Sequence, residues 1–314
     1  MILRPDLARL LFVLLCAALP FGSFHASKAG AVEAPALELR VLGSGGPGAG
    51  GRAGAGYVLL LDGQPRVLVD AGPGTFVRLG EARLDLRQLD TVLLTHLHVD
   101  HVGELPGIVK ARAVSARRAI DFKVFGPDAG PGFPSTRQLI DRLFGDDGAF
   151  PYLQAFAGRL TFHTTNLFPR QTADSPTPLV IVDQDGLKIS ALPGHHRDAP
   201  AVIYRIDYKG KSLTFSGDID PQGHAALTRI AQGSDLLVFN AVVLDPPGSP
   251  AVLYDLHTAP TDIGQISAAA GVSRLLLSHL SADIDQARDA VTTSIHQSFN
   301  GPVQFAEDGQ RLDF

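Results

Sequence analysis

Three histidines and an aspartate crowd into six positions of the stretch "LLTHLHVDH" (93–101), directly after an apolar run. On an extended backbone His96 and His98 point to the same side, because side chains alternate along a strand. A helical turn after them would aim Asp100 and His101 at a neighbouring point. Four ligand-type side chains on so short a segment exceed what one tetrahedral zinc ion readily takes. We therefore expect two adjacent metal ions, each completed by residues from elsewhere in the chain.

Any further metal ligand must be histidine, aspartate or glutamate, because Cys16 is the sole cysteine and lies in an N-terminal segment that we expect to be removed. In that segment Arg4 and Arg9 flank the start of the apolar run "LLFVLLCAALPFG", and small residues follow. This pattern is typical of a secretory signal peptide, which we predict over residues 1–31. The mature chain would then be periplasmic or secreted. An uncleaved membrane anchor stays an open alternative.

The charge of the chain bears on its partners. The formal net charge is −5, and loss of the predicted signal peptide removes three basic residues and one acidic residue, which brings it to −7. A nucleic-acid partner is disfavoured, because binding a long nucleic acid usually requires a basic face. We expect a small-molecule substrate and no membrane contact after cleavage, with a homodimer as an open alternative.

Short apolar runs separated by Gly, Pro and Asp predict two series of strands, at about 36–96 and 178–240. Helices are expected at 135–144, 222–231, 260–270 and 283–294. Strand clusters with helices between and after them indicate a layered α/β fold, which we assign to one catalytic domain over 36–314. The segment 113–176, rich in Pro, Gly and aromatic residues, is expected to be an insertion near the site.

The segment "GSGGPG" (43–48) fits the G-x-G-x-x-G pattern of dinucleotide-binding turns. Such a site needs a helix to begin there, so that its N-terminus faces the pyrophosphate. Here Pro47 and further glycines lead into another predicted strand instead. We therefore expect a backbone loop that approaches a site, and no nucleotide fingerprint.

The stretch "THLHVDH" resembles the His-x-His-x-Asp-His signature of the metallo-β-lactamase fold superfamily, and the resemblance covers most of residues 37–314. The other segments that carry it are "LVDAGPGT" (68–75), "PGHHRDAPAVIYRID" (193–207), "TFSGDI" (214–219) and "LLLSHLS" (275–281). The resemblance implies an α/β fold of the four-layer αββα metallo-β-lactamase sandwich type. It also implies a metal-dependent hydrolase with two Zn²⁺ ions per chain.

Carried over position by position, the resemblance implies seven metal ligands in two groups with a bridge. One ion would be held by His96, His98 and His196. The other would be held by Asp100, His101 and His279, with Asp218 bridging the two ions. His195 competes with His196, and the spacing to "PAVIYR" favours His196 while leaving both open. The remaining histidines considered are expected at the surface, His163 on a strand and His224 and His296 on helices.

The segment "HTAPTDIGQISAAAGVSRLLLSHLS" (257–281) looks most like ribonuclease Z and its relatives among arylsulfatases and cyclic-nucleotide phosphodiesterases. In ribonuclease Z a histidine matching His257 protonates the leaving oxygen with the help of a glutamate, in whose place this sequence has Asn240. The catalytic candidates are therefore Asp100 and His257. The resemblance implies hydrolysis of a small ester: a phosphodiester, a sulfate ester or a lactone. A ribonuclease Z-like nuclease, a β-lactamase and a non-hydrolytic metal-binding protein stay open as alternatives.

Overall fold

The computed structural model describes residues 34–314 except 49, 117–118, 157–158 and 169–176. Residues 34–314 form one compact unit. The predicted signal peptide, residues 1–31, lies outside the described residues. Within the part of the chain that is described, no helix is long and apolar enough to cross a membrane.

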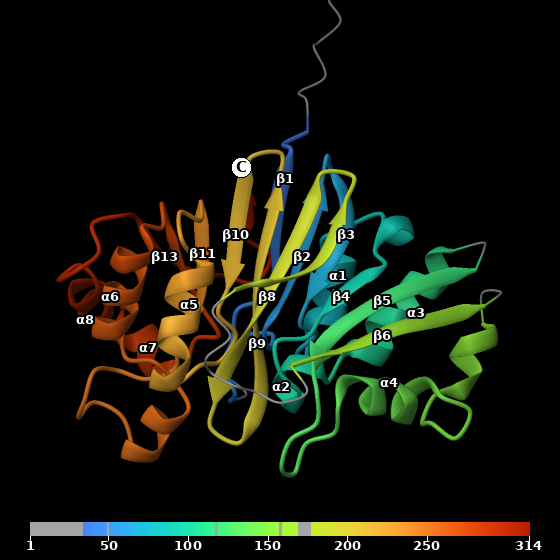
Figure 1. Ribbon diagram of the computed structural model, residues 1–314, viewed down its shortest axis with the longest axis horizontal. Helices are drawn as coiled ribbons and strands as arrows, with labels where there is room; N and C mark the ends of the chain where they lie inside the picture. The colour runs from blue at the N-terminus through green and yellow to red at the C-terminus, as the bar shows by residue number, and fades with distance from the viewer. Residues whose placement is uncertain (1–33, 49, 117–118, 157–158, 169–176) are drawn as a thin grey trace, which may run out of the picture. The chain divides into compact units, whose positions relative to one another are not determined.

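Two seven-stranded sheets form the centre of this unit (Figure 1). The order in the first sheet is β14 (Arg311–Asp313), β1 (Leu37–Gly43), β2 (Gly56–Leu61), β3 (Gln64–Val69), β4 (Thr91–Leu93), β5 (Ile120–Pro127) and β6 (Leu160–Leu167). The order in the second sheet is β13 (Val303–Phe305), β12 (Leu275–Ser278), β11 (Leu236–Asn240), β10 (Lys211–Phe215), β9 (Ala199–Tyr208), β8 (Leu187–His196) and β7 (Leu179–Gln184).

The two sheets repeat one connection pattern, which agrees with the two similar strand series in the sequence. In the first sheet β1, β2 and β3 pair antiparallel, and β3 to β6 pair parallel. In the second sheet β7 to β10 pair antiparallel, and β10 to β13 pair parallel. Antiparallel hairpins therefore supply one part of each sheet, and crossover connections supply the other.

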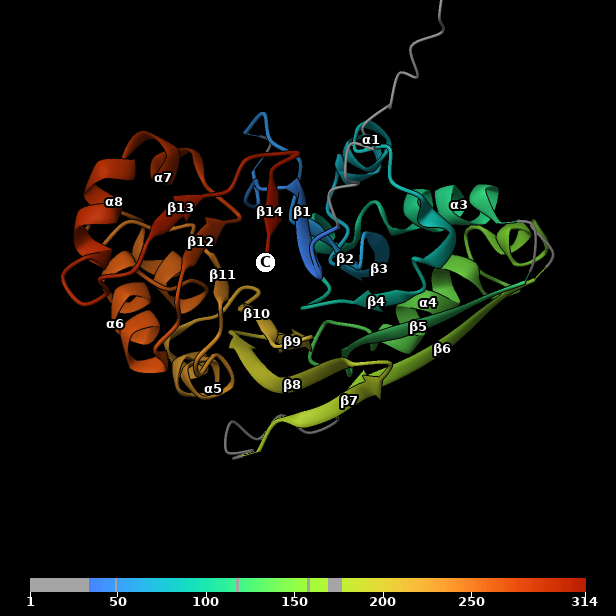
Figure 2. The same cartoon turned by 90° about the horizontal axis from the view of Figure 1, so that it is seen from above.

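Helices cover the outer face of each sheet (Figure 2). The helices are α1 (Thr75–Glu81), α2 (Val99–Val102), α3 (Leu105–Ser115), α4 (Thr136–Phe144), α5 (His224–Ile230), α6 (Pro260–Ala270), α7 (Ala282–Gln286) and α8 (Arg288–Ile295). One apolar cluster lies between the two sheets, a second joins the first sheet to α1, α3 and α4, and a third joins the second sheet to α5, α6 and α8. Each sheet thus buries both faces, and the predicted αββα sandwich is confirmed.

Local sequence signals account for the helices. Helix α4 begins after Ser135, whose hydroxyl accepts the Gln138 backbone N–H while the Gln138 side chain accepts the Ser135 N–H, so both form a capping box. The helix predicted over 283–294 is two helices, α7 and α8, that meet at Ala287. Residues 113–176, predicted as an insertion, supply β5 and β6 to the first sheet and α4 to its outer face.

The ends of the parallel strands bring distant parts of the chain together. Asp70 directly follows β3, and the histidine-rich stretch follows β4. In the second sheet Asp218 follows β10, and His279 follows β12. Carboxyl ends of parallel strands lie at one edge of a sheet, where ligand sites of α/β folds form. The ends of the two sheets lie side by side, so the predicted site residues from both sheets meet there.

Candidate metal centre

The residues His96 to His101 span the transition from β4 to α2. His98 is extended (φ −65°, ψ 149°) and is the residue from which α2 begins. Asp100 and His101 occupy the first turn of α2, so they face a different point from His96 and His98. The predicted change from strand to helix is what gives this short segment two separate ligand groups.

His96, His98 and His196 form the first group, with ligand-type atoms within 4.8 Å of one another. The Nε2 of His96 lies 3.1 Å from the Nδ1 of His98. The Nδ1 of His196 donates a hydrogen bond of 2.7 Å to the carbonyl of Leu256, so its Nε2 carries the lone pair. A backbone acceptor of this kind fixes the tautomer and ring orientation of a metal-binding histidine.

Asp100, His101 and His279 form the second group. The Nε2 of His279 lies 3.1 Å from the Nε2 of His101 and 3.1 Å from an oxygen of Asp100. The Nδ1 of His101 donates to the carboxylate of Asp70 at 2.8 Å, and this contact turns its Nε2 towards the group. Asp70 itself is held by the backbone N–H and hydroxyl of Thr95, at 2.8 and 2.7 Å.

Asp70 was not among the residues singled out from the sequence. The signal that could have found it is the aspartate of "LVDAG", which ends a buried strand as Asp218 does in "TFSGD". It is 2% exposed and adopts a left-handed backbone conformation, φ 55°. His279 has the same unusual conformation, φ 54°. Such strain in residues other than glycine is concentrated at functional sites.

Asp218 lies between the two groups and is 3% exposed. Imidazole nitrogens surround its carboxylate at 3.5 to 3.9 Å; they belong to His96, His101, His196, His257 and His279. Burial alone would raise the pKa of Asp218, but the surrounding imidazoles, His279 first, hold it well below its usual value. The carboxylate is therefore ionised, and its position fits a bridge between two ions.

The separations between these donor atoms fit metal ions. Two ligands bound tetrahedrally to one zinc at about 2.0–2.1 Å lie roughly 3.3 Å apart. The nitrogen–nitrogen distances of 3.1 Å between His96 and His98, and between His101 and His279, are close to that value. Burial and the neighbouring imidazoles lower the pKa of His96 and His98, so their lone pairs are available. The donor set thus fits two divalent ions, and its nitrogen-rich character favours zinc.

His257, from the segment before α6, lies beside His196 and Asp218. It is 5% exposed, and its Nδ1 lies 3.8 Å from Asp218 and has no hydrogen-bond partner among the described residues. Burial, followed by repulsion from neighbouring imidazoles, lowers the pKa of His257 to about 4, although Asp218 opposes the shift. His257 is therefore neutral at pH 7.

Asn240 makes a different contact from the one expected. It was predicted to stand beside His257, where a glutamate would keep the imidazole protonated. Its side-chain amide instead donates to Asp218 at 2.7 Å, and within the described residues no hydrogen bond joins Asn240 to His257. Asn240 ends β11 next to β10, and this adjacency directs its side chain towards Asp218. Asn240 therefore positions the central carboxylate.

The structure separates the two adjacent histidines. His196 faces the first group, whereas the Nδ1 of His195 pairs with Asp220 at 2.6 Å. The side chain of His195 is 27% exposed and that of His196 is 2% exposed. Alternation along β8 sends the two side chains to opposite faces. The geometry therefore favours His196 as the ligand.

The remaining histidines that the structure describes lie outside the two groups. His163 is exposed on β6, and His296 is exposed after α8, as predicted. His224 was predicted to face solvent, but it is half-buried and bonds the Thr258 hydroxyl at 3.0 Å. It stands at the first position of α5, which packs against α6, and this contact covers it.

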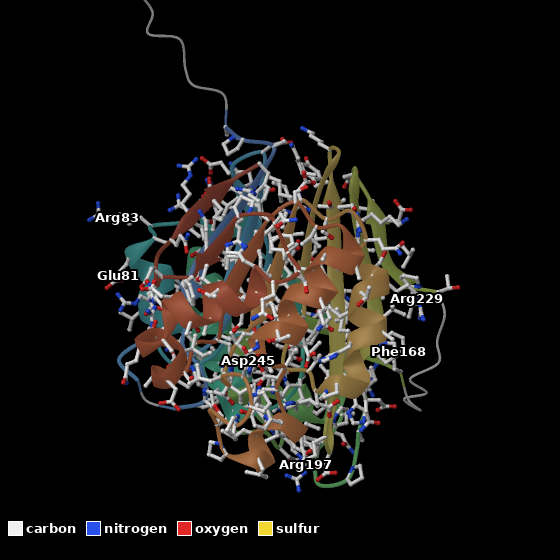
Figure 3. The ribbon with its side chains drawn as sticks, turned by 90° about the vertical axis from the view of Figure 1, so that its left-hand side faces the viewer. Glu81, Arg83, Phe168, Arg197, Arg229 and Asp245 are labelled. Atoms are coloured by element: carbon white, nitrogen blue, oxygen red, sulfur yellow. The ribbon has the colours of Figure 1, made fainter. Side chains whose placement is uncertain are left out.

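The segment predicted as an insertion reaches the site at Phe133. Phe133, in the turn between β5 and α4, places its ring 5.4 Å from the ring of His98. Arg197 lies at the nearby β8–β9 turn and projects from the lower edge of the protein in Figure 3.

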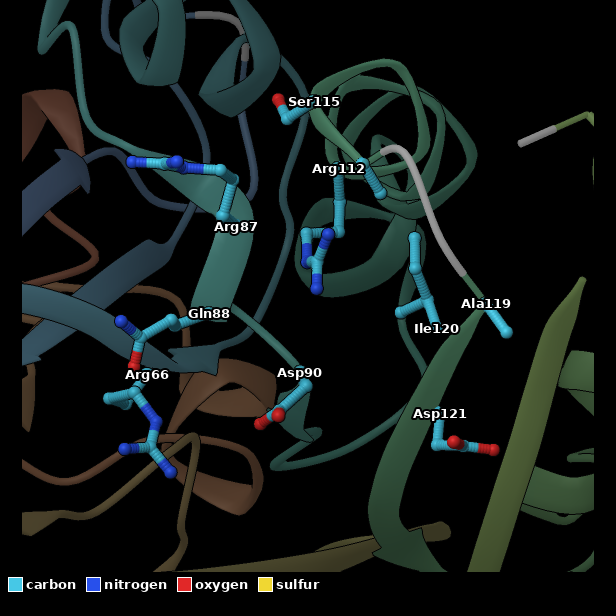
Figure 4. A pocket seen from close by; sticks show the side chains of 10 residues that line it. Arg66, Arg87, Gln88, Asp90, Arg112, Ser115, Ala119, Ile120 and Asp121 are labelled. Carbon is cyan, nitrogen blue, oxygen red and sulfur yellow. The ribbon is translucent and has the colours of Figure 1, made fainter. Parts of the chain in front are cut away.

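A cavity lined by Arg66, Asp90 and Arg112 among others lies at the amino ends of β4 and β5 (Figure 4). It is thus at the opposite end of the sheet from the histidines.

Comparisons with known proteins agree with this geometry. Residues 51–280 match the family model described as "Metallo-beta-lactamase superfamily". Ribonuclease Z of Mycobacterium avium (strain 104) is 29% identical over 297 residues, which cover 88% of this chain and 98% of the relative. Among solved structures, the metallo-beta-lactamase fold protein YhfI of Bacillus subtilis aligns with a TM-score of 0.66 at 19% identity, covering 88% of this chain and 99% of that one. The short form of human tRNase Z aligns with a TM-score of 0.65 at 19% identity, covering 88% and 98%.

Proposed function

The chain belongs to the metallo-β-lactamase superfamily, and from this premise we propose that it is a metal-dependent hydrolase that cleaves phosphodiester bonds. One observation carries the proposal. Four separated segments, from both sheets, bring seven histidine and aspartate side chains together, with donor separations that fit two metal ions.

We assign one zinc ion to His96, His98 and His196 and a second to Asp100, His101 and His279, with Asp218 shared. Bound there, the ions would activate water at neutral pH and offset negative charge on the bond attacked. The protein supplies the orientation of the ligands. Asp70 fixes the tautomer of His101, and the Leu256 carbonyl fixes that of His196.

Asp100 and His257 are the residues proposed to handle protons. The pKa of Asp100 is lowered to about 2: burial opposes the shift, and the neighbouring His279 and His101 outweigh it. Its side chain is 17% exposed, so this carboxylate can accept a hydrogen bond from a water molecule in the site. His257, neutral at pH 7, can donate a hydrogen bond to a departing oxygen but is a weak acid. Leaving groups that need little protonation should therefore react best.

The relatives support a phosphodiester as the bond that is cleaved. Ribonuclease Z, by its name, acts on RNA, which is linked by phosphodiester bonds. This favours a phosphodiester over a sulfate ester, a lactone or a β-lactam as the substrate. It also speaks against the expectation that nucleic acid is disfavoured as a partner. The acidic net charge of −5 favours a short oligonucleotide or a small nucleotide ester over a long RNA.

A substrate comparison on the purified full chain tests the proposal. We expect about two zinc ions per chain, and turnover of bis(p-nitrophenyl) phosphate and of a 3′-extended oligoribonucleotide above that of a p-nitrophenyl sulfate, a lactone and a cephalosporin. A chelator should abolish the turnover, and added zinc should restore it. Turnover of the sulfate or the lactone alone would contradict the phosphodiester proposal.

We further propose that the protein is exported through cleavage of residues 1–31. The apolar run after Arg4 and Arg9, followed by small residues, supports this. Fractionation of producing cells and N-terminal sequencing of the recovered protein test it. A chain recovered from the cytoplasm with Met1 still present would contradict export.

A further inference from the structure

The turn between β5 and α4 is built firmly beside the metal centre. The backbone N–H of Phe133 donates to the carbonyl of Gly130 at 3.0 Å, and the N–H of Gly130 donates back at 3.3 Å. Asp128, which opens the turn, accepts hydrogen bonds from the Ala129 N–H at 2.8 Å and the Asn166 side chain at 3.0 Å. These contacts fix the backbone that carries the Phe133 ring.

The turn also rests against the β8–β9 turn that follows His196. A methyl group added at Gly130 would come within 2.5 Å of the ring of Pro200, at the start of β9, and 3.7 Å from the carbonyl oxygen of Asp198 in the turn itself, so the two turns are in close contact. Because β8 ends in His196, this contact couples the Phe133 turn to the first ligand group. The Phe133 side chain is partly exposed, and its ring centroid lies 5.4 Å from that of His98, tilted by 51°.

A partly exposed aromatic ring on a fixed turn, in contact with a proposed metal ligand, is suited to contact what binds at the metals. We propose that Phe133 determines specificity by stacking on an aromatic ring of the substrate, a nucleobase joined to the phosphate held at the metal centre. Every nucleobase presents a flat face, so an aromatic side chain can hold it without reading its sequence. This inference rests on the proposed phosphodiesterase function and names its substrate class.

Equilibrium binding measurements distinguish the contact of Phe133 with the nucleobase from the contact of the metal centre with the phosphate. The zinc-loaded full chain is titrated by calorimetry with adenosine 5′-monophosphate and, separately, with inorganic phosphate. We expect Phe133→Leu to weaken binding of the nucleotide about 5- to 150-fold, the range typical of loss of one stacked base, and to leave phosphate binding unchanged. Phe133→Tyr keeps the ring and should bind the nucleotide as wild type does.

Two more variants sharpen the test. Tyr152 is an exposed aromatic residue outside the site, where it lies beside Lys110, so Tyr152→Leu should leave both affinities unchanged. Gly130→Ala should push the turn away from Pro200 and weaken nucleotide binding without loss of phosphate binding. Nucleotide affinity equal to wild type in Phe133→Leu would overturn the inference, as would equal losses for nucleotide and phosphate. A wild-type protein that binds neither ligand would instead overturn the proposed function, and this inference with it.

Discussion

At the scale of single residues, the face of β8 on which His195 and His196 each lie decides which of them can bind metal. His196 points to the ligand group, and His195 points to Asp220. We expect His196→Ala to lose at least one metal ion per chain. His195→Ala should keep both ions and lower metal affinity or activity by at most about 10- to 100-fold, the range for residues that support ligands. Metal content measured by mass spectrometry decides between them, and the opposite pattern would show that His195 is the ligand.

Asn240 permits a second test at the same scale, because its amide donates to Asp218. Asn240→Asp keeps the shape of the side chain but places a second carboxylate 2.7 Å from the first. Like charges at such a distance cannot both ionise readily. In metal-free protein we therefore expect Asn240→Asp to lower the free energy of unfolding more at pH 8 than at pH 5.

The matched control is Asn240→Ala, which removes the hydrogen bond without adding charge. It should cost roughly 1–3 kcal/mol at both pH values, as expected for an unsatisfied buried acceptor. Urea unfolding at the two pH values measures both variants. Equal losses for Asn240→Asp at pH 8 and pH 5 would show that the two side chains do not interact as described.

At the scale of elements, the turn after β10, which carries Asp218, determines the geometry of the metal centre as much as Asp218 itself does. Gly217 has φ +58°, and a methyl group added there would lie 2.8 Å from the Cβ of Thr95. Thr95 in turn holds Asp70 through two hydrogen bonds. Gly217→Ala should therefore disturb both sheets at the metal centre, with a loss of stability greater than about 1 kcal/mol and reduced zinc binding.

Gly210, in the turn between β9 and β10, provides the comparison for Gly217. It has φ +77° and open space where a side chain would be added. Gly210→Ala should show the cost of backbone strain alone, with full zinc content. Thermal unfolding and metal analysis of the two variants side by side isolate the contact with Thr95. Equal stability and equal zinc content in both would contradict the role given to that contact.

At the scale of the whole molecule, burial of histidines makes stability depend on pH. The pKa values of His96, His98, His224 and His257 are lowered, chiefly by burial, the last to about 4. Between pH 6.5 and 4 the unfolded chain therefore binds more protons at these residues than the folded chain does. Their contribution to stability is complete above pH 6.5 and is lost as the pH falls towards 4.

His101 acts in the opposite sense. Burial would lower its pKa, but Asp70 and Asp218 outweigh that and raise it well above the ordinary value. Its contribution is present at low pH and is lost only as the pH rises through the raised pKa. Because four histidines oppose this one, metal-free protein should unfold at lower urea concentration at pH 5 than at pH 7. A midpoint that does not change between these values would contradict this account.

The sequence alone determined what depends on local order along the chain. The alternation of "THLHVDH", followed by a helical turn, defines two directions for its side chains, and the fold and family followed from the segments at 68–75, 193–207, 214–219 and 275–281. The helices predicted at 135–144 and 260–270 are likewise within a residue of their observed bounds. These features need only contacts between near neighbours, so the sequence expresses them directly.

Only the tertiary structure decided the contacts between strands that are distant in sequence. Asp70 supports His101 because β3 and β4 are neighbours in the first sheet, and Asn240 reaches Asp218 because β10 and β11 are neighbours in the second. The position of Phe133 against His98 depends on two turns meeting at the site. Partners of this kind are set by strand pairing and by packing between layers, which no spacing along the chain records.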